Sequence, residues 1–262
     1  MIEENPSITL KKIKEKILSK KEVNLSISSI RNGLKKLKIT LKNVSIDLDR
    51  RNEPRTIQMR QRYALDFSKK APENRDKIIF IDGSGFNCRL RRGKARSKIN
   101  TPARITVPTV KGRNVSLISA INTEGIVHHQ VISNTSVNSK IFCNFLEQLF
   151  QKLEEQNLQN VWLILDNCSI HKTNEVRNLV NKTSHSLIFL PPYSLMLNPI
   201  EEVFSKIKMS ARNMLADPEN IQVKTLVDII NDSVATVTST NCYNYYMNMY
   251  MKIPIAAAGD DL

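Results

Sequence analysis

The sequence has few of the features that mark secreted, membrane-spanning or disulfide-linked proteins. Only 4 of the 262 residues are cysteine, and they lie too far apart to form a CxxC pair: Cys88, Cys143, Cys168 and Cys242. This spacing argues against a zinc ribbon and a disulfide framework. No apolar run reaches the roughly 18 residues of a transmembrane helix. The N-terminal sequence MIEENPSITLKK lacks the apolar segment of a secretory signal. We therefore expect reduced thiols and an intracellular protein that is not secreted.

Acidic residues are also scarce relative to basic ones. The chain has 39 Lys and Arg against 25 Asp and Glu, a formal charge of +14. Residues 1–75 hold 19 of the basic residues and 9 of the acidic ones, so most of the excess lies there. Such a block attracts polyanions without regard to their sequence. A Lys-rich solvated surface is the alternative, but the charge favours nucleic acid as the partner.

The basic N-terminal region shows two short amphipathic patterns. The first covers residues 7–18, with Ser7 or Thr9 as its cap, and the second covers 27–39 after the cap Ser26. The apolar stripe of the second helix is predicted to comprise Ile27, Ile30, Leu34 and Leu37. Its opposite face offers polar and basic side chains for DNA: Ser28, Ser29, Arg31, Asn32, Lys35 and Lys36. The pair suits a helix-turn-helix with a wing at 40–52, although any small three-helix piece shows similar stripes.

The remaining patterns predict an α/β fold with a mixed sheet. Strand-like runs occupy 77–82, 161–166 and 186–190, and a hairpin covers 115–132. Amphipathic helices are expected at 138–156, 174–182 and 223–237, with the last closing the chain. This order is typical of helices packed on a mixed sheet. We expect a helix-turn-helix subdomain at 1–50, a linker helix at 51–75 and an α/β domain at 76–262.

Two of the predicted strands end in an aspartate, Asp82 and Asp166. Ligands of open α/β sheets bind at the carboxyl ends of strands. A single aspartate there is equally well explained by its preference for turns, but two together with a third acid weaken that explanation. Clustered carboxylates repel one another unless a cation joins them, and Mg²⁺ or Mn²⁺ prefers such oxygen ligands.

The third acid is expected in the segment LPPYSLMLNPIEEVFSKIK, residues 190–208. Asn198 suits the N-cap of a helix, Pro199 its first position and Glu201 its third, which is close to a capping box. The helix would bury Ile200, Val203, Phe204 and Ile207. That spacing places Glu201 at the edge of the buried face. It turns Glu202 toward water, with Lys206 as an ion-pair partner.

Together, IFIDGSGF, ILDNCSIHK and the 190–208 segment resemble the catalytic core of mariner-superfamily transposases, which are DDE recombinases with a ribonuclease-H-like fold. The 34 residues between Asp166 and Glu201 match the spacing of the family's DDE members. The resemblance covers 76–215, and residues 1–50 resemble the family's second helix-turn-helix. The chain is therefore expected to be shortened at its N-terminus. It departs from the family pattern at Gly83 and Leu195, where a second acid and a proline are usual.

The resemblance implies that Asp82, Asp166 and Glu201 form a catalytic triad that binds Mg²⁺ or Mn²⁺, with two ions. One ion would activate water or a 3′-hydroxyl while the other stabilises the leaving oxygen. Asn167, His171 and Asn198 would support the site, with packing at a helix start as the alternative for His171. A basic loop would contact DNA phosphates, with a solvated loop as the alternative: Arg89, Arg91, Arg92, Lys94, Arg96 and Lys98.

The implied activity is cleavage of double-stranded DNA at transposon ends and transfer of the freed strand into target DNA. The resemblance also implies a homodimer when active, located in the nucleus of a eukaryotic host or otherwise in the cytoplasm. A transposase-derived protein, or an inactive remnant, that binds DNA without cutting is the main alternative. A ribonuclease-H-like nuclease with no role in transposition is a third.

Overall fold

The computed structural model describes residues 2, 7–42, 49–87, 90, 102, 115–133, 135–217 and 223–262. The chain forms two compact units, Met1–Asp47 and Leu48–Leu262. Within the described residues, no helix has both the length and the hydropathy needed to cross a membrane.

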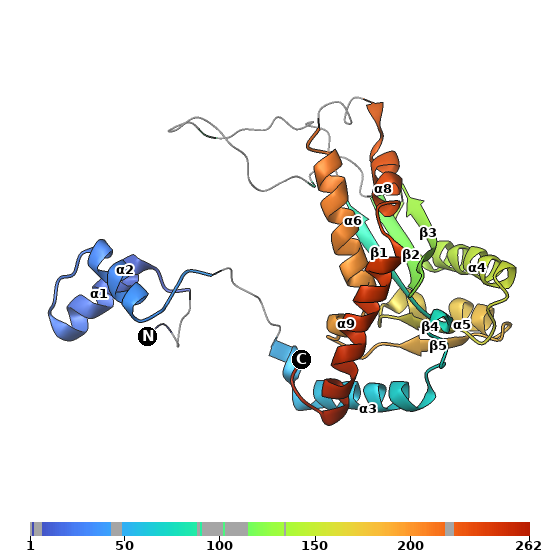
Figure 1. The fold of residues 1–262 in the computed structure, drawn as a ribbon, viewed down its shortest axis with the longest axis horizontal. Coiled ribbons are helices and arrows are strands. Elements are labelled where there is room, and N and C mark those ends of the chain that lie inside the picture. Colours follow the sequence, from blue (N-terminus) through green and yellow to red (C-terminus); the bar gives the residue numbers. More distant parts are fainter. Residues whose placement is uncertain are drawn as a thin grey trace. The chain divides into compact units, whose positions relative to one another are not determined.

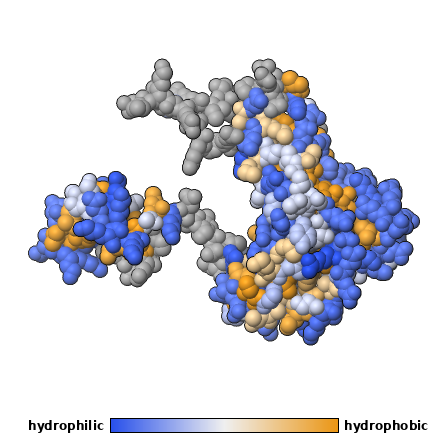
Figure 2. Space-filling view, viewed as in Figure 1, coloured by the Kyte–Doolittle hydropathy of each residue, from blue (hydrophilic) through white to orange (hydrophobic). Residues whose placement is uncertain are grey.

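The first unit contains the two predicted helices, α1 (Leu10–Lys21) and α2 (Ile27–Lys36). Both begin at a hydroxyl side chain that accepts a backbone N–H: Thr9 caps α1 and Ser26 caps α2. The predicted apolar stripe of α2 is only partly confirmed. Ile30 is buried, but Ile27 is 38% and Leu37 70% exposed. Figure 2 accordingly shows hydrophobic as well as hydrophilic residues on the visible face of this unit.

The second unit is built on a five-stranded sheet in the order β3-β2-β1-β4-β5. The strands are β1 (Ile78–Phe86), β2 (Val115–Asn122), β3 (Gly125–Ile132), β4 (Trp162–Leu165) and β5 (Ser186–Phe189). Strands β1, β2 and β3 pair antiparallel, whereas β4 runs parallel to both β1 and β5. The mixed sheet and the hairpin are therefore confirmed. Strand β1 lies at the centre, which explains its continuous apolar run IIFI.

Helices cover both faces of this sheet (Figure 1). One face packs against α4 (Ser139–Glu155) and α5 (Asn174–Val180), and the other against α6 (Ile200–Met214), α8 (Leu226–Val234) and α9 (Ser239–Ala258). Short 3-10 turns lie at Asp49–Asn52, Arg75–Lys77, Ser169–Lys172 and Leu195–Leu197. Side chains alternate between the faces along β1, so Ile79 and Ile81 meet α4 while Ile78 and Phe80 lie in the α6 core.

The C-terminal prediction was wrong, because a second and longer helix follows the expected one. Helix α9 contains many Asn and Tyr residues and an internal Pro254, which are poor signals for a helix. Packing overrides them, since Tyr246 and Met249 are buried in the α6 core. The segment expected as a linker helix forms α3 (Pro54–Lys70), which packs against α9 and buries Ala64 and Phe67.

The buried hydroxyl of Tyr246 joins α9 to the two central strands. It lies 2.9 Å from the carbonyl oxygen of Ile78 and 2.8 Å from that of Ile121. We predict that Tyr246→Phe lowers the free energy of unfolding by about 1–2 kcal/mol, because a buried acceptor loses its donor. Urea denaturation measures this loss. Tyr243→Phe is the control, since Tyr243 is exposed on the same helix. Equal stability of the two variants would contradict the prediction.

Candidate active site

The register of the parallel pair β1–β4 places Asp82 beside Asp166. Ile81 is paired with Leu165, the last residue of β4, so the next residue on each chain is an aspartate. By the alternation of side chains, Asp82 shares the sheet face of Phe80, which lies in the α6 core. Both aspartates thus follow the last paired residues of two neighbouring parallel strands.

The predicted end of the first strand was wrong. Strand β1 continues past Asp82 to Phe86 by pairing with β2, and Asp82 stands opposite Ser119 in that ladder. The first carboxylate is therefore held inside a strand at the point where β4 has already ended. Its Oδ1 accepts the backbone N–H of Gly83 at 2.6 Å. This backbone contact and the strand pairing fix its place.

Asn198 does not cap α6 as predicted. The helix starts at Ile200 with Pro199 in the N-cap position, and no side chain caps it. The buried amide of Asn198 instead donates from Nδ2 to Oδ2 of Asp82, 3.0 Å away. The capping-box prediction for Glu201 fails with it, because Asn198 accepts the N–H of Glu201 through its backbone carbonyl rather than its side chain.

Helix α6 places the two adjacent glutamates in different surroundings, as predicted, but the surroundings of Glu202 differ from the predicted ones. The predicted stripe is buried: Ile200, Val203, Phe204 and Ile207. Glu201 is half-buried beside it, and its carboxylate makes no hydrogen bond to the described residues. Glu202 was predicted to face water with Lys206. It is also half-buried, and its Oε2 accepts a hydrogen bond from Asn248 of α9 at 3.1 Å.

The second aspartate is anchored by the turn that follows β4. Oδ1 of Asp166 accepts the N–H of Cys168 at 2.9 Å and lies 2.8 Å from Nδ1 of His171. The His171 ring is buried and packs on Phe142 with 4.4 Å between centroids. His171 thus packs in the core and also contacts one oxygen of Asp166. Oδ2 of Asp166 has no hydrogen-bond partner among the described residues.

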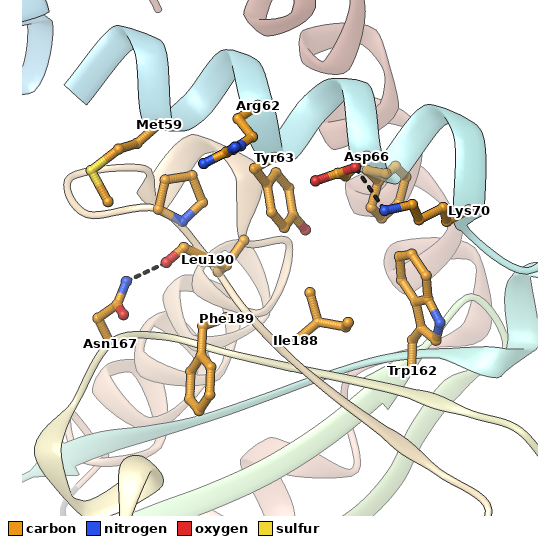
Figure 3. A pocket seen from close by; sticks show the side chains of 12 residues that line it. Met59, Arg62, Tyr63, Asp66, Lys70, Trp162, Asn167, Ile188, Phe189 and Leu190 are labelled. Atoms are coloured by element: carbon orange, nitrogen blue, oxygen red, sulfur yellow. Dashed lines mark hydrogen bonds and ion pairs between the residues drawn. The ribbon is translucent and has the colours of Figure 1, made fainter. Parts of the chain in front are cut away.

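The hydrogen bond of the Asn167 side chain is to the backbone and not to one of the carboxylates. Its side-chain amide donates to the carbonyl of Leu190, at the end of β5. Figure 3 shows this contact at one end of a groove that α3 and the β4–β5 edge line. Asn167 therefore ties the loop after β4 to the loop that leads into α6.

The three carboxylates lie close enough to influence one another electrostatically. Burial, followed by the charges of Asp166 and Glu201, raises the pKa of Asp82 to about 6, against the lowering effect of the Gly83 N–H. Burial and the charge of Asp166 also raise the pKa of Glu201, while nearby Lys208 lowers it. The hydrogen bond from His171 is the main reason why the pKa of Asp166 is lowered. The site therefore holds one stably ionised carboxylate and two whose charge is disfavoured.

This donor set suits a divalent cation, which would relieve the repulsion and prefers carboxylate oxygens. Glu201 and Oδ2 of Asp166 have no hydrogen bond to give up. Within the described parts of the chain, however, no three His, Cys, Asp or Glu side chains have the spacing of a bound metal ion. The three acidic side chains lie near one another, but they are not spaced to bind a single metal ion.

The predicted DNA contacts divide into two groups. The six polar and basic residues of α2 are all exposed, as expected for a face that meets a ligand. The basic loop lies outside the described residues: Arg89, Arg91, Arg92, Lys94, Arg96 and Lys98. Sequence reasoning missed Lys208, which acts on the pKa of Glu201 from two helical turns away on the same face. Its i, i+7 spacing from Glu201 was the available signal.

The strand order, the helices on both faces and the paired aspartates define a ribonuclease-H-like fold. A family model described as DDE superfamily endonuclease matches residues 77–222, more than half of the chain. The chain therefore belongs to the DDE superfamily endonucleases, and its likeness to solved structures is to a mariner-type transposase. No curated protein matches the sequence.

Solved structures similar to this chain include complexes and the catalytic domain of the Mos1 mariner transposase. The paired-end complex with the left transposon end has a TM-score of 0.74 at 16% identity, covering 99% of this chain and 76% of that one. The paired-end complex with Mg has a TM-score of 0.75 at 17% identity, covering 100% and 77%. The catalytic domain has a TM-score of 0.57 at 14% identity, covering 84% and 100%. At these identities the likeness establishes the fold.

The raised pKa of Asp82 generates a prediction about stability and pH. The folded-state value of about 6 lies above the roughly 3.9 of an unfolded chain, so the folded state loses stability as the pH rises between these values. We predict that Asp82→Asn, in EDTA, raises the free energy of unfolding by about 3 kcal/mol at pH 8 and changes it little at pH 4. Urea denaturation at both values measures the difference.

Asp66→Asn is the matched control for this prediction. Asp66 is exposed, and its hydrogen bond with Lys70 lowers its pKa, so this substitution should give no gain at pH 8. A gain for Asp82→Asn that is the same at pH 4 and pH 8 would show that the carboxylate charge is not its cause.

Proposed function

We propose that this chain is a DDE transposase that cleaves DNA strands at transposon ends and transfers them into target DNA, with Asp82, Asp166 and Glu201 as its catalytic and metal-binding acids. The supporting observation is that three carboxylates from β1, the end of β4 and the start of α6 lie within one another's electrostatic reach. Placing them together costs folding free energy, which a bound cation would offset.

Asp82, Asp166 and Glu201 would supply oxygen ligands for Mg²⁺ or Mn²⁺, with two ions in the site. Two divalent cations held in this way supply an activated water or 3′-hydroxyl and stabilise the charge on the leaving oxygen. The similar Mos1 complexes include paired-end structures with Mn and with Mg, in keeping with this choice of metal.

The other residues of the site hold these acids or the DNA. His171 fixes one oxygen of Asp166, which leaves Oδ2 to face a ligand. Lys208 brings a positive charge near Glu201, where it would meet a DNA phosphate. The exposed polar face of α2 would contact DNA in the first unit, and the basic loop at 89–98 would contact phosphates near Asp82.

Double-stranded DNA is the proposed substrate, both as transposon end and as target, and a homodimer is the proposed active form. The similar Mos1 structures are described as a paired-end complex with a transposon end and as a strand-transfer complex, which supports DNA as the substrate. A transposase-derived protein that binds DNA without cutting is the second candidate. The spacing of the acids favours it, because no three of the described side chains are placed to hold one ion.

A nicking assay on supercoiled DNA with Mn²⁺ or Mg²⁺ separates the two candidates. We predict metal-dependent nicking that falls at least about 100-fold in each of Asp82→Ala, Asp166→Ala and Glu201→Gln. Loss of a direct ligand should exceed the roughly 10–100-fold cost of losing an outer partner. Glu202→Gln is the matched control, because a glutamine still accepts the hydrogen bond from Asn248.

The possible results lead to distinct conclusions. Wild-type protein that shifts DNA in a gel but leaves it uncut with either metal would favour the DNA-binding candidate. Nicking that survives in Glu201→Gln and is lost in Glu202→Gln would show that the third acid is misassigned. Nicking that survives in all three acid variants would contradict the proposed site.

A further inference from the structure

The side chain of Asn198 contacts the Asp82 carboxylate, and the proposed reaction does not by itself explain this contact. Its side chain is 3% exposed and lies between the turn Leu195–Leu197 and α6. Nδ2 donates to Oδ2 of Asp82 at 3.0 Å, across 116 positions of sequence. The other oxygen of Asp82 accepts the N–H of Gly83. These two hydrogen bonds, one to each oxygen, restrict rotation of the carboxylate.

The second polar atom of the same amide is its oxygen, Oδ1. Oδ1 of Asn198 is buried and has no hydrogen-bond partner among the described residues. A buried acceptor without a donor costs about 1–3 kcal/mol. Such a group in a folded protein needs an explanation, and a missing water or ion is among the usual ones.

A second buried asparagine, Asn122, shows the hydrogen bonds that such a side chain makes when its role is only structural. Asn122 is 4% exposed and uses both ends of its amide. Its Oδ1 accepts the N–H groups of Glu124 and Gly125 at 2.9 and 3.1 Å, and its Nδ2 donates to the carbonyl of Asp76 at 3.4 Å. Asn122 thus completes a hairpin turn, whereas Asn198 keeps one acceptor unused beside a carboxylate.

The position of Asn198 in the chain adds a connection between two of the acids. It lies three residues before Glu201, and its backbone carbonyl accepts the N–H of Glu201 at 3.2 Å. One residue therefore contacts the first carboxylate through its side chain and the backbone of the third acid through its carbonyl. A shift of the loop before α6 would move Glu201 and would remove the donor from Oδ2 of Asp82.

We propose that Asn198 is a positioning residue that orients the Asp82 carboxylate relative to Glu201 for a hydrated divalent cation. Its unused Oδ1 would accept a hydrogen bond from a water of that cation, because Mg²⁺ usually keeps several of its waters. This inference rests on the proposed function, since it concerns the same site.

Asn198→Leu tests the inference, because leucine has nearly the shape of asparagine and no hydrogen-bonding atom. Titration calorimetry of the full chain with Mn²⁺ should show an affinity about 10–100-fold weaker than wild type, the usual cost of losing an outer partner. The substitution removes an unsatisfied acceptor but also takes the donor from Oδ2 of Asp82, so the deciding measurement is the Mn²⁺ affinity of folded protein, with the melting temperature recorded without metal. In the nicking assay, the half-saturating Mn²⁺ concentration should rise by the same factor, with the rate recovering at high Mn²⁺.

Asn198→Ala provides a second variant, and Asn122→Ala is the matched control. The alanine variant at 198 should lose Mn²⁺ affinity in the same range as the leucine variant. Asn122→Ala should lower the melting temperature and leave Mn²⁺ affinity unchanged. A purely structural role for Asn198 predicts the pattern of Asn122.

The outcomes separate this inference from the proposed function. Wild-type affinity for Mn²⁺ in either folded variant at 198 overturns the role of Asn198 and leaves the proposed function intact. A wild-type chain that neither binds Mn²⁺ nor nicks DNA overturns the proposed function itself. Weaker binding that is matched by Asn122→Ala would assign the effect to general destabilisation and contradict the inference.

Discussion

The parallel alignment of β1 with β4 is the constraint on which the candidate site depends. Pairing of Ile81 with Leu165 places the residues that follow, Asp82 and Asp166, beside each other on neighbouring strands, whose backbones lie about 4.8 Å apart. The charge of Asp166 disfavours ionisation of Asp82, and burial disfavours it further. The sheet core on both faces holds the alignment in place, so the repulsion is built into the fold. The arrangement of these acids therefore lowers the stability of the folded chain, and it favours binding of a cation or a proton.

The surroundings divide the charge unequally among the acids. His171 and the N–H of Cys168 stabilise the ionised form of Asp166, whose pKa is lowered. Asp82 and Glu201 lie in less favourable surroundings, and burial is the largest cause of the raised pKa of each. Titratable groups whose environments push their pKa values apart are typical of sites with distinct chemical roles. In the proposed metal site, the ionised Asp166 would be the first ligand, and a cation bound there would favour ionisation of Asp82 and Glu201.

Local patterns predicted the strands, the hairpin and the buried stripe of α6, but they placed Asp82 at the end of its strand rather than within it. They failed where the partner lies far away in sequence. Asn198 is a residue type that often caps helices, yet its side chain donates a hydrogen bond to Asp82. Glu202 accepts a hydrogen bond from Asn248, which lies in a helix that was not predicted. Strand β1 extends beyond the end of β4 because β2 pairs with it on the other side. A single sequence contains no signal for such choices, since several partners satisfy the same side chain and only the packed sheet decides among them.

Crystals grown with Mn²⁺ test the proposed metal site without reference to activity, because anomalous scattering locates the ion. We predict Mn²⁺ between Asp82 and Asp166, at about 2.0–2.3 Å from their oxygens. Glu201 should turn in to bind the same ion or a second one. Mn²⁺ bound elsewhere, Glu202 in place of Glu201, or three carboxylates that stay apart at saturating Mn²⁺ would show that these acids do not form the metal site.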